Sequence, residues 1–219
     1  MESKKRLITS FIFNILEIIL VIIGVILMFT IGSGALASNK IDVLKYFTLQ
    51  SNLFMAAISL IVAFYQFKIL KGKKKELPYP LVVTNLVATC AVGVTFTVVI
   101  FILGRLYGYD KMYNQANLFF HLLAPVCALI NFLFIQKDQK VKFAHTPFGL
   151  LPCLSYGIVY FIVVASLNGY GDLKIDFYGF GTGGPLNGII NFAIILVITY
   201  VLILILYFVN YLILQRKKK

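Results

Sequence analysis

Four hydrogen-bonding side chains stand together where one of the longest apolar stretches of this chain begins. The segment KYFTLQSN, residues 45–52, contains Thr48, Gln50, Ser51 and Asn52. The spacing of Thr48, Ser51 and Asn52 places them on one face of a helix. A hydroxyl group becomes a nucleophile when an adjacent base takes its proton, and imidazole is the usual base near neutral pH. A threonine at a helix start can also serve only as a cap.

His121 is the candidate base, because it is an ionisable side chain inside another long apolar stretch. Such groups are costly at membrane depth and normally face a cavity or a partner. The alternative is a purely structural hydrogen bond between helices. Pro125 has no N–H to donate to the carbonyl of His121, so we expect the helix to kink beside the histidine.

The composition decides the class of protein that must position these groups. Of 219 residues, 60% are hydrophobic, the mean hydropathy is +0.92 and only 13% are charged. That charged share is about half of what soluble proteins carry. Six stretches are long and apolar enough to cross a bilayer as helices. They cover about residues 7–30, 46–70, 81–103, 116–136, 148–167 and 186–214. We predict an all-α fold in which residues 1–219 form one polytopic bundle of six transmembrane helices.

The distribution of lysine and arginine predicts the orientation of the bundle. Fifteen of these residues lie on the side that holds both termini, and five lie on the other side. This asymmetry over short loops places both termini in the cytoplasm of a cell-membrane protein. The net charge of +12 then reflects contact with anionic lipids of the inner leaflet rather than with nucleic acid.

Other cofactor and metal chemistry finds no support in the pattern. Cys90, Cys127 and Cys153 all fall inside spans and are expected to be packing residues, and their spacing does not suit a metal site. The chain has no phosphate-binding loop in a strand–loop–helix context, so we expect neither a metal nor a cofactor. The glycine-rich stretch 168–188 lies in the last external loop and is interpreted as a flexible lid or a turn-rich connector, and we expect residues 168–185 to be a mobile or re-entrant cover over the polar residues.

With this orientation, polar residues of five spans fall in one layer of the outer half of the membrane. At about 1.5 Å per residue, Thr48 and Ser51 lie within roughly 8 Å of the outer boundary, and His121 is at a similar depth. The layer contains Thr48, Ser51, Asn52, Thr97, Asn117, His121, Tyr160, Asn187 and Asn191. A hydroxyl and an imidazole at matching depth supply both parts of a nucleophile–base pair, but Ser51 offers the same chemistry as Thr48.

Glu17 is a second anomaly, near the middle of the first span, with Ser10 and Asn14 on the same helix face. It could orient His121 or bind a proton or a cation. Its depth, roughly 10 Å below His121, argues against a direct hydrogen bond. The alternative is a protonated glutamate bonded to Asn14 or to a neighbouring span, since a buried carboxyl is readily kept neutral.

The same residues carry a resemblance to a known family. KYFT at 45–48 and His121 early in the fourth span, within six spans and short loops, resemble the androgen-induced membrane protein family. Its animal members are threonine-dependent hydrolases of fatty acid esters of hydroxy fatty acids. The segments YFTLQSNL, HLLAPVCALINFLF (121–134) and DFYGF (176–180) are more similar still to a bacterial branch of small membrane proteins.

The resemblance implies that Thr48 is the nucleophile and His121 its base. In the animal branch an Asn-Thr pair and a later acidic residue follow the histidine, whereas residues 122–125 here are Leu-Leu-Ala-Pro. The partner that orients the histidine is therefore left open.

Two classes of function follow. The first is an intramembrane hydrolase of lipid or fatty-acyl esters that arrive laterally from the outer leaflet. Thr48 and His121 would be its catalytic residues, supported by Ser51, Asn52, Asn117, Tyr160, Asn191 and Glu17. The second is a protein that binds or transports a small molecule, similar to the substrate-binding membrane subunit of a vitamin importer. A purely structural membrane protein is the third interpretation, since no nucleophile-elbow motif supports an enzyme independently.

The predicted orientation can be tested by thiol labelling. In a variant without the three native cysteines, Lys73→Cys should react with a membrane-impermeant reagent only from the cytoplasmic side. The control, Lys111→Cys, should react only from outside. Labelling of Lys73→Cys on intact cells would overturn the orientation.

Overall fold

The computed structural model describes residues 2–31, 42–136 and 140–215, and every regular element in these ranges is helical. Six of its helices are long and apolar enough to cross a membrane, which confirms the predicted all-α class and the number of spans. Some of the basic residues that predict the orientation lie outside the described residues, namely Lys40, Lys137 and those at 216–219.

The six spans are built from continuous and composite helices. The continuous ones are α1 (Glu2–Thr30), α2 (Phe47–Leu70) and α9 (Pro185–Gln215). The third span joins α3 (Tyr79–Val98), η2 (Val99–Leu103) and α4 (Gly104–Tyr107). The fourth joins α6 (Ala116–Leu118), η3 (Phe119–Leu123), α7 (Ala124–Ile130) and η4 (Asn131–Ile135). The fifth joins the 3₁₀ segment η5 (Phe143–Leu150) to α8 (Leu151–Ser166).

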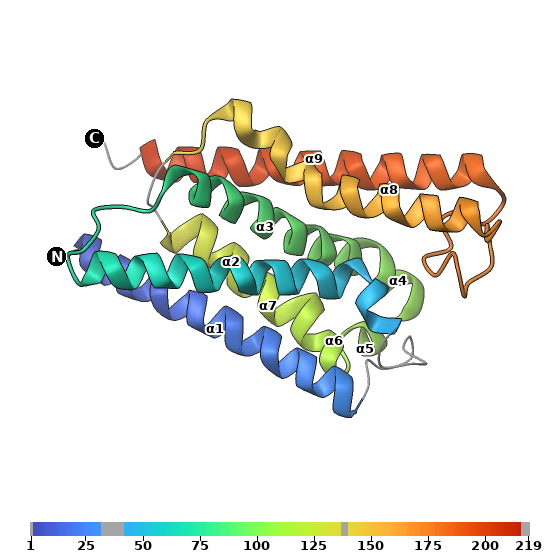
Figure 1. Ribbon diagram of the computed structural model, residues 1–219, viewed down its shortest axis with the longest axis horizontal. Coiled ribbons are helices and arrows are strands. Elements are labelled where there is room, and N and C mark those ends of the chain that lie inside the picture. The colour runs from blue at the N-terminus through green and yellow to red at the C-terminus, as the bar shows by residue number, and fades with distance from the viewer. Residues whose placement is uncertain (1, 32–41, 137–139, 216–219) are drawn as a thin grey trace.

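Short helices complete the connections at the end away from the termini (Figure 1), and proline explains two departures from regular geometry. The short helices are η1 (Asp42–Lys45) and α5 (Tyr109–Met112). Just before Pro125, residues 119–123 widen into a π-type turn, because proline cannot donate to the carbonyl of His121. The fifth span begins at Phe143, five residues earlier than predicted, in a 3₁₀ segment that contains Pro147.

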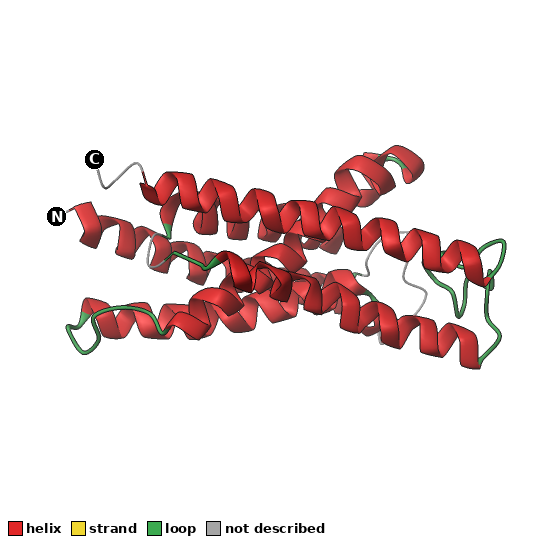
Figure 2. Cartoon of the chain, turned by 90° about the horizontal axis from the view of Figure 1, so that it is seen from above, coloured by secondary structure: helices red, strands yellow, loops and turns green. Residues whose placement is uncertain are grey.

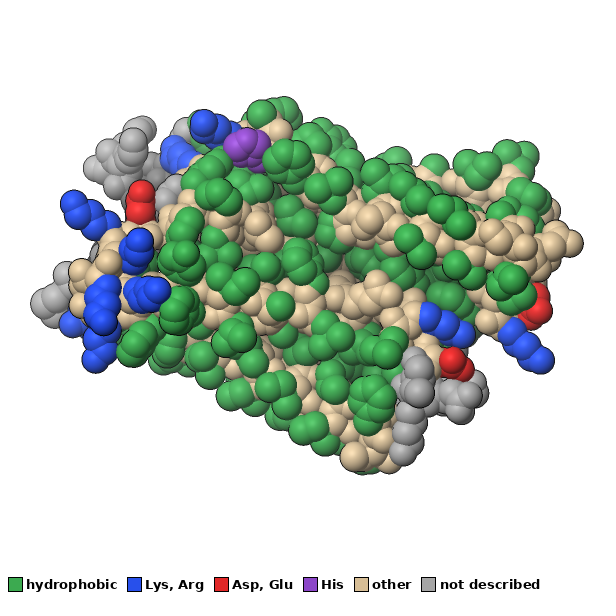
Figure 3. All heavy atoms as spheres, in the orientation of Figure 1, with side chains coloured by type: hydrophobic (Ala, Val, Ile, Leu, Met, Phe, Trp, Pro, Cys, Tyr) green, Lys and Arg blue, Asp and Glu red, His purple; other side chains and the backbone are tan. Residues whose placement is uncertain are grey.

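The helices run lengthwise and bring both chain ends to one end of the molecule (Figure 1). The third span is the most extensively buried, and α3 packs against α2, α7, α8 and α9. Helices α8 and α9 lie on one side of α3, and α1 lies on the other side (Figure 1), while loops occupy the two ends of the molecule (Figure 2). Hydrophobic side chains cover the middle of the surface, whereas lysine and arginine gather mostly at the end that holds the termini (Figure 3).

A closed ring of hydrogen bonds joins α1, α2 and the fourth span in the end of the bundle that holds the termini. The Ser10 hydroxyl donates to Asn131 (2.9 Å), whose amide donates to Asn14 (3.1 Å). Asn14 donates to Gln66 (2.9 Å), and Gln66 donates back to Ser10 (2.9 Å). All four side chains are buried. Because lipid offers no hydrogen bonds, the ring fixes these helices at one relative height.

Candidate functional site

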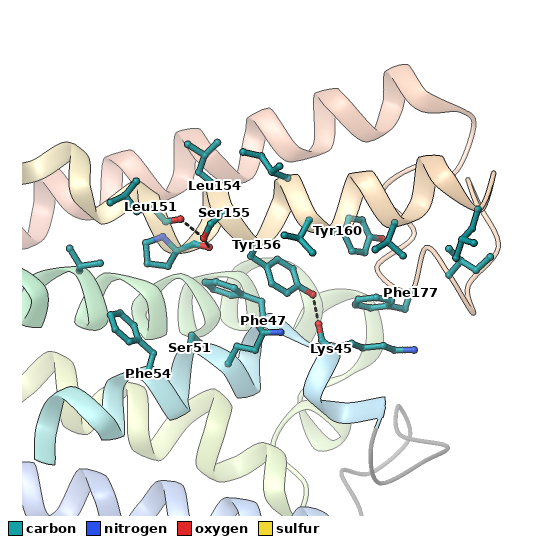
Figure 4. Close-up of a pocket in the computed structure, with 18 of the residues that line it drawn as sticks. Lys45, Phe47, Ser51, Phe54, Leu151, Leu154, Ser155, Tyr156, Tyr160 and Phe177 are labelled. Carbon is teal, nitrogen blue, oxygen red and sulfur yellow. Dashed lines mark hydrogen bonds between the residues drawn. The ribbon is translucent and has the colours of Figure 1, made fainter.

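Two grooves flank helix α8. The α2–α8 groove has a volume of about 1010 Å³ and is lined by one face of α2, by Val87, by residues of α8 and by the loop that follows α8. Figure 4 shows how its side chains lie between the two helices. The α3–α9 groove, on the other side of α8, has a volume of about 420 Å³. Phe47, Tyr156 and Tyr160 line both grooves.

The loop between α8 and α9 covers one end of both grooves. Lys174, Ile175 and Phe177 line the α2–α8 groove, and residues 178–180 line the α3–α9 groove. The glycine-rich stretch therefore lies over the polar side chains of α2 and α8, at the position predicted from the sequence. Its predicted mobility stays a prediction.

Asp176 holds this loop in place. Its side chain is fully buried and accepts hydrogen bonds from the Tyr160 hydroxyl and from the N–H groups of Gly171 (3.1 Å) and Gly181 (2.8 Å). Gly171 has a φ of 79°, a left-handed conformation that glycine adopts without strain. Three converging donors make Asp176 the point at which the loop is tied to α8. Asp176 was not among the residues predicted from the sequence, although it lies in the DFYGF segment.

Two tyrosines fasten the same loop and α8 to the start of α2. The Tyr178 hydroxyl accepts the N–H of Phe47 (2.9 Å), and the Tyr156 hydroxyl donates to the carbonyl of Lys45 (2.6 Å). Tyr46 occupies the N-cap position of α2, but its side chain makes no capping hydrogen bond. Tyr178 therefore satisfies one of the free N–H groups at the start of α2. Burial raises the pKa of Tyr178 to about 12, so its hydroxyl stays protonated at neutral pH. The KYFT segment is thus the docking point of the loop.

Thr48 and His121 lie in different surroundings. The Thr48 side chain lines the α3–α9 groove, whereas His121 is buried and lines neither groove. Among the described residues, no hydrogen bond joins the Thr48 hydroxyl to the imidazole. The Nδ1 atom of His121 donates to the carbonyl of Met112 (2.8 Å). Since a carbonyl only accepts, Nε2 is the basic nitrogen of the neutral ring. The backbone of Met112 is therefore the orienting partner that the sequence left open.

The other predicted supporting residues do not form a single network. Ser51 bonds to the carbonyl of Thr48 (3.1 Å) and to the Thr95 hydroxyl (3.2 Å). The amide of Asn52 donates to the carbonyls of Thr48 (2.7 Å) and Phe120 (3.1 Å), which joins α2 to the fourth span.

The remaining three amides of the layer also bond to nearby backbone, and that of Asn187 donates to the carbonyl of Thr182 (3.1 Å). Asn117 contacts the carbonyl of Lys111 (3.5 Å), and Asn191 donates to the carbonyl of Phe180 (2.9 Å) in the loop. The predicted layer is thus a set of separate polar links between elements, of which Thr48, Tyr160 and Asn191 reach the α3–α9 groove.

Glu17 is buried elsewhere. Of the two kinds of partner expected for it, Asn14 is not one, because Asn14 bonds to Gln66 and Asn131 in the ring, whereas the thiol of Cys127 on the neighbouring fourth span lies beside the carboxyl. Both carboxyl oxygens of Glu17 are buried, and no N–H or O–H group of the described residues contacts them. His121 is held by Met112 rather than by Glu17.

No group of three or more His, Cys, Asp or Glu side chains that could hold a metal occurs in the described part of the chain. Cys90, Cys127 and Cys153 are buried and free. Cys90 and Cys153 face Thr199 of α9, as expected of packing residues.

Comparison of this chain with protein families, with characterised proteins and with solved structures found no match. The resemblance to the androgen-induced membrane protein family therefore stays a prediction. The function must be argued from the geometry of the grooves and their polar residues.

Asp176→Asn should release the loop from α8, because the amide of asparagine can no longer accept all three hydrogen bonds. Amide hydrogen exchange at residues 169–182 should accelerate by about tenfold or more, as expected for a loss of about 1–3 kcal/mol. Asp172→Asn is the matched control, since Asp172 is exposed and bonds only to the N–H of Lys174 within its own turn. Equal exchange in the two variants would contradict the role of Asp176.

Proposed function

We propose that this protein lies in the cell membrane with both termini in the cytoplasm and binds an anionic amphiphile of the outer leaflet. The α2–α8 groove carries this proposal. Its α8 wall is apolar and faces outward, with Leu151, Val159 and Leu167 each more than half exposed. A lipid chain can enter such a groove sideways from the bilayer.

The size of the groove suits an acyl chain. Ligand pockets of proteins usually measure about 300–1,000 Å³. Lipid tails are as apolar as the groove, so moving a chain from the bilayer into it gains little hydrophobic free energy. Selectivity must therefore come from polar groups at the end of the groove where the headgroup lies.

Two lysines lie at that end. Lys45 precedes α2, and its ammonium group is 4.7 Å from the ring of Phe177 in the covering loop. Lys174 belongs to the same loop, and both residues line the α2–α8 groove. Two lysines that line an apolar groove complement a carboxylate or phosphate headgroup on an acyl chain. Ser51 and Ser155 add hydroxyl groups to the lining.

Filling the groove should abolish binding. Val159→Trp should block the chain site, whereas Ile162→Trp on the same helix should not, because Ile162 is exposed and lines neither groove. Lys45→Gln together with Lys174→Gln should weaken binding of an anionic amphiphile by about tenfold, the size expected of two partly exposed ion pairs. The control, Lys111→Gln, changes an exposed lysine that lines neither groove.

The measurement is displacement of a fluorescent fatty acid from the protein in lipid nanodiscs, repeated with a zwitterionic competitor. The anionic competitor should displace the fluorescent fatty acid at a lower concentration than the zwitterionic one. The difference between the two concentrations should decrease at high salt. Equal binding in Val159→Trp and Ile162→Trp would contradict the proposed function.

Ester hydrolysis is the second candidate, and the position of Thr48 favours it. The Thr48 side chain faces the α3–α9 groove within a turn that Tyr178 and Tyr156 fasten to α8. The threonine oxygen would attack the ester carbonyl while Nε2 of His121 accepts its proton and passes it to the leaving alcohol, and water would then release the acid. This step requires His121 to approach Thr48 once substrate is bound, a tightening common at catalytic sites.

A fluorophosphonate probe tests this second candidate. Covalent labelling should fall on Thr48 and be lost in both Thr48→Ala and His121→Ala, because the members of a catalytic unit act together. Ser51→Ala and Glu17→Gln should reduce labelling less. Absence of any label, together with a bound amphiphile that raises the melting temperature, would leave a binding or transport protein instead of a hydrolase.

A further inference from the structure

Glu17 is a buried carboxyl group that no N–H or O–H group of the described residues contacts. It lies near the middle of α1 and is 1% exposed, and the thiol of Cys127 is the polar group beside it. The hydroxyl of Ser59 on α2 is likewise fully buried and unpartnered within the described structure. Unpaired buried polar atoms are rare in folded proteins and call for an explanation.

The neighbouring polar groups are committed to other partners. Asn14 lies one helical turn before Glu17 and belongs to the closed ring with Gln66, Asn131 and Ser10. None of the hydrogen bonds of this ring reaches the Glu17 carboxyl. The ring therefore fixes α1 against its neighbours without pairing Glu17.

The ionisable groups around Glu17 supply no positive charge. Cys127 of α7 lies within hydrogen-bonding reach of the carboxyl, and its single thiol proton is shared with the carbonyl of Phe13 (3.6 Å). Helix α2 has no ionisable side chain from Phe47 to Phe64. The imidazole of His121 is bonded to Met112. On α1 itself, the nearest charged residues are at its N-terminal end, where Arg6 begins the apolar stretch.

We propose that Glu17 is a proton-binding site of the membrane interior, occupied at neutral pH. A carboxylate with no cationic partner and only a weak, shared thiol donor is strongly disfavoured in such surroundings, and a single bound proton removes the charge. The equilibrium is the uptake of one proton by one carboxylate to give one carboxylic acid.

This site would couple proton binding to helix packing. Loss of the proton places an uncompensated charge between α1 and its partners α2 and α7, so water or a cation must enter. Separation of these helices, in turn, would expose Glu17 and release its proton. This inference does not depend on what the grooves bind.

Infrared spectroscopy with isotope labelling tests the proposal. The chain has three glutamates, Glu2, Glu17 and Glu76. In the variant Glu2→Gln/Glu76→Gln, carbon-13 in the glutamate carboxyl group reports on Glu17 alone, without a change inside the bundle. In nanodiscs at neutral pH, the carbonyl stretch of a protonated carboxylic acid should appear and should shift with the label.

Glu17→Gln should remove this band, whereas Glu76→Gln, at an exposed position, should leave it unchanged. The labelled double variant decides the question even if Glu17→Gln fails to fold. A label that shifts only carboxylate bands at neutral pH would overturn the proposal. A carboxylate band that responds to sodium would replace the proton by a cation and would overturn it as well.

Discussion

Polar side chains inside this bundle must find partners within the protein, because the hydrocarbon of a bilayer has no water to offer them. That constraint explains the ring of Ser10, Asn14, Gln66 and Asn131, in which each side chain both donates and accepts. Slippage of α1, α2 or the fourth span along its axis would break several of these bonds together. The ring therefore fixes the relative position of these helices at one end of the bundle.

The other end of the bundle meets the same constraint with a loop. Asp176 gathers two N–H groups and a tyrosine hydroxyl, and Tyr178 satisfies an N–H at the start of α2. These bonds hold the loop over helix α8, and a groove remains on each of two sides of that helix. The result is a covered end above two lateral grooves, an arrangement that suits an amphiphile with its headgroup under the loop and its chain along α8.

The separation of Thr48 and His121 bears on the choice between binding and catalysis. Binding needs only the grooves and charges that are already in place. Hydrolysis also needs the histidine to leave a buried position at the Met112 carbonyl or to be met by a moving Thr48. Near Pro125 the fourth span has a π-type turn, an irregularity often associated with function, and such a turn can change its register at small cost. The geometry therefore supports binding more directly than ester cleavage.

The sequence by itself determined the all-helical class, the six spans and the burial of Ser10, Asn14 and Glu17 on one helix face, since hydropathy and helical period are local properties. It also placed the glycine-rich cover and the irregular turn beside Pro125. Only the tertiary structure decided that Asn14 pairs with Gln66, that Met112 orients His121 and that Asp176 anchors the loop. Matching depth within a membrane brings residues to one layer, but the rotation and lateral position of each helix decide which side chains in that layer meet.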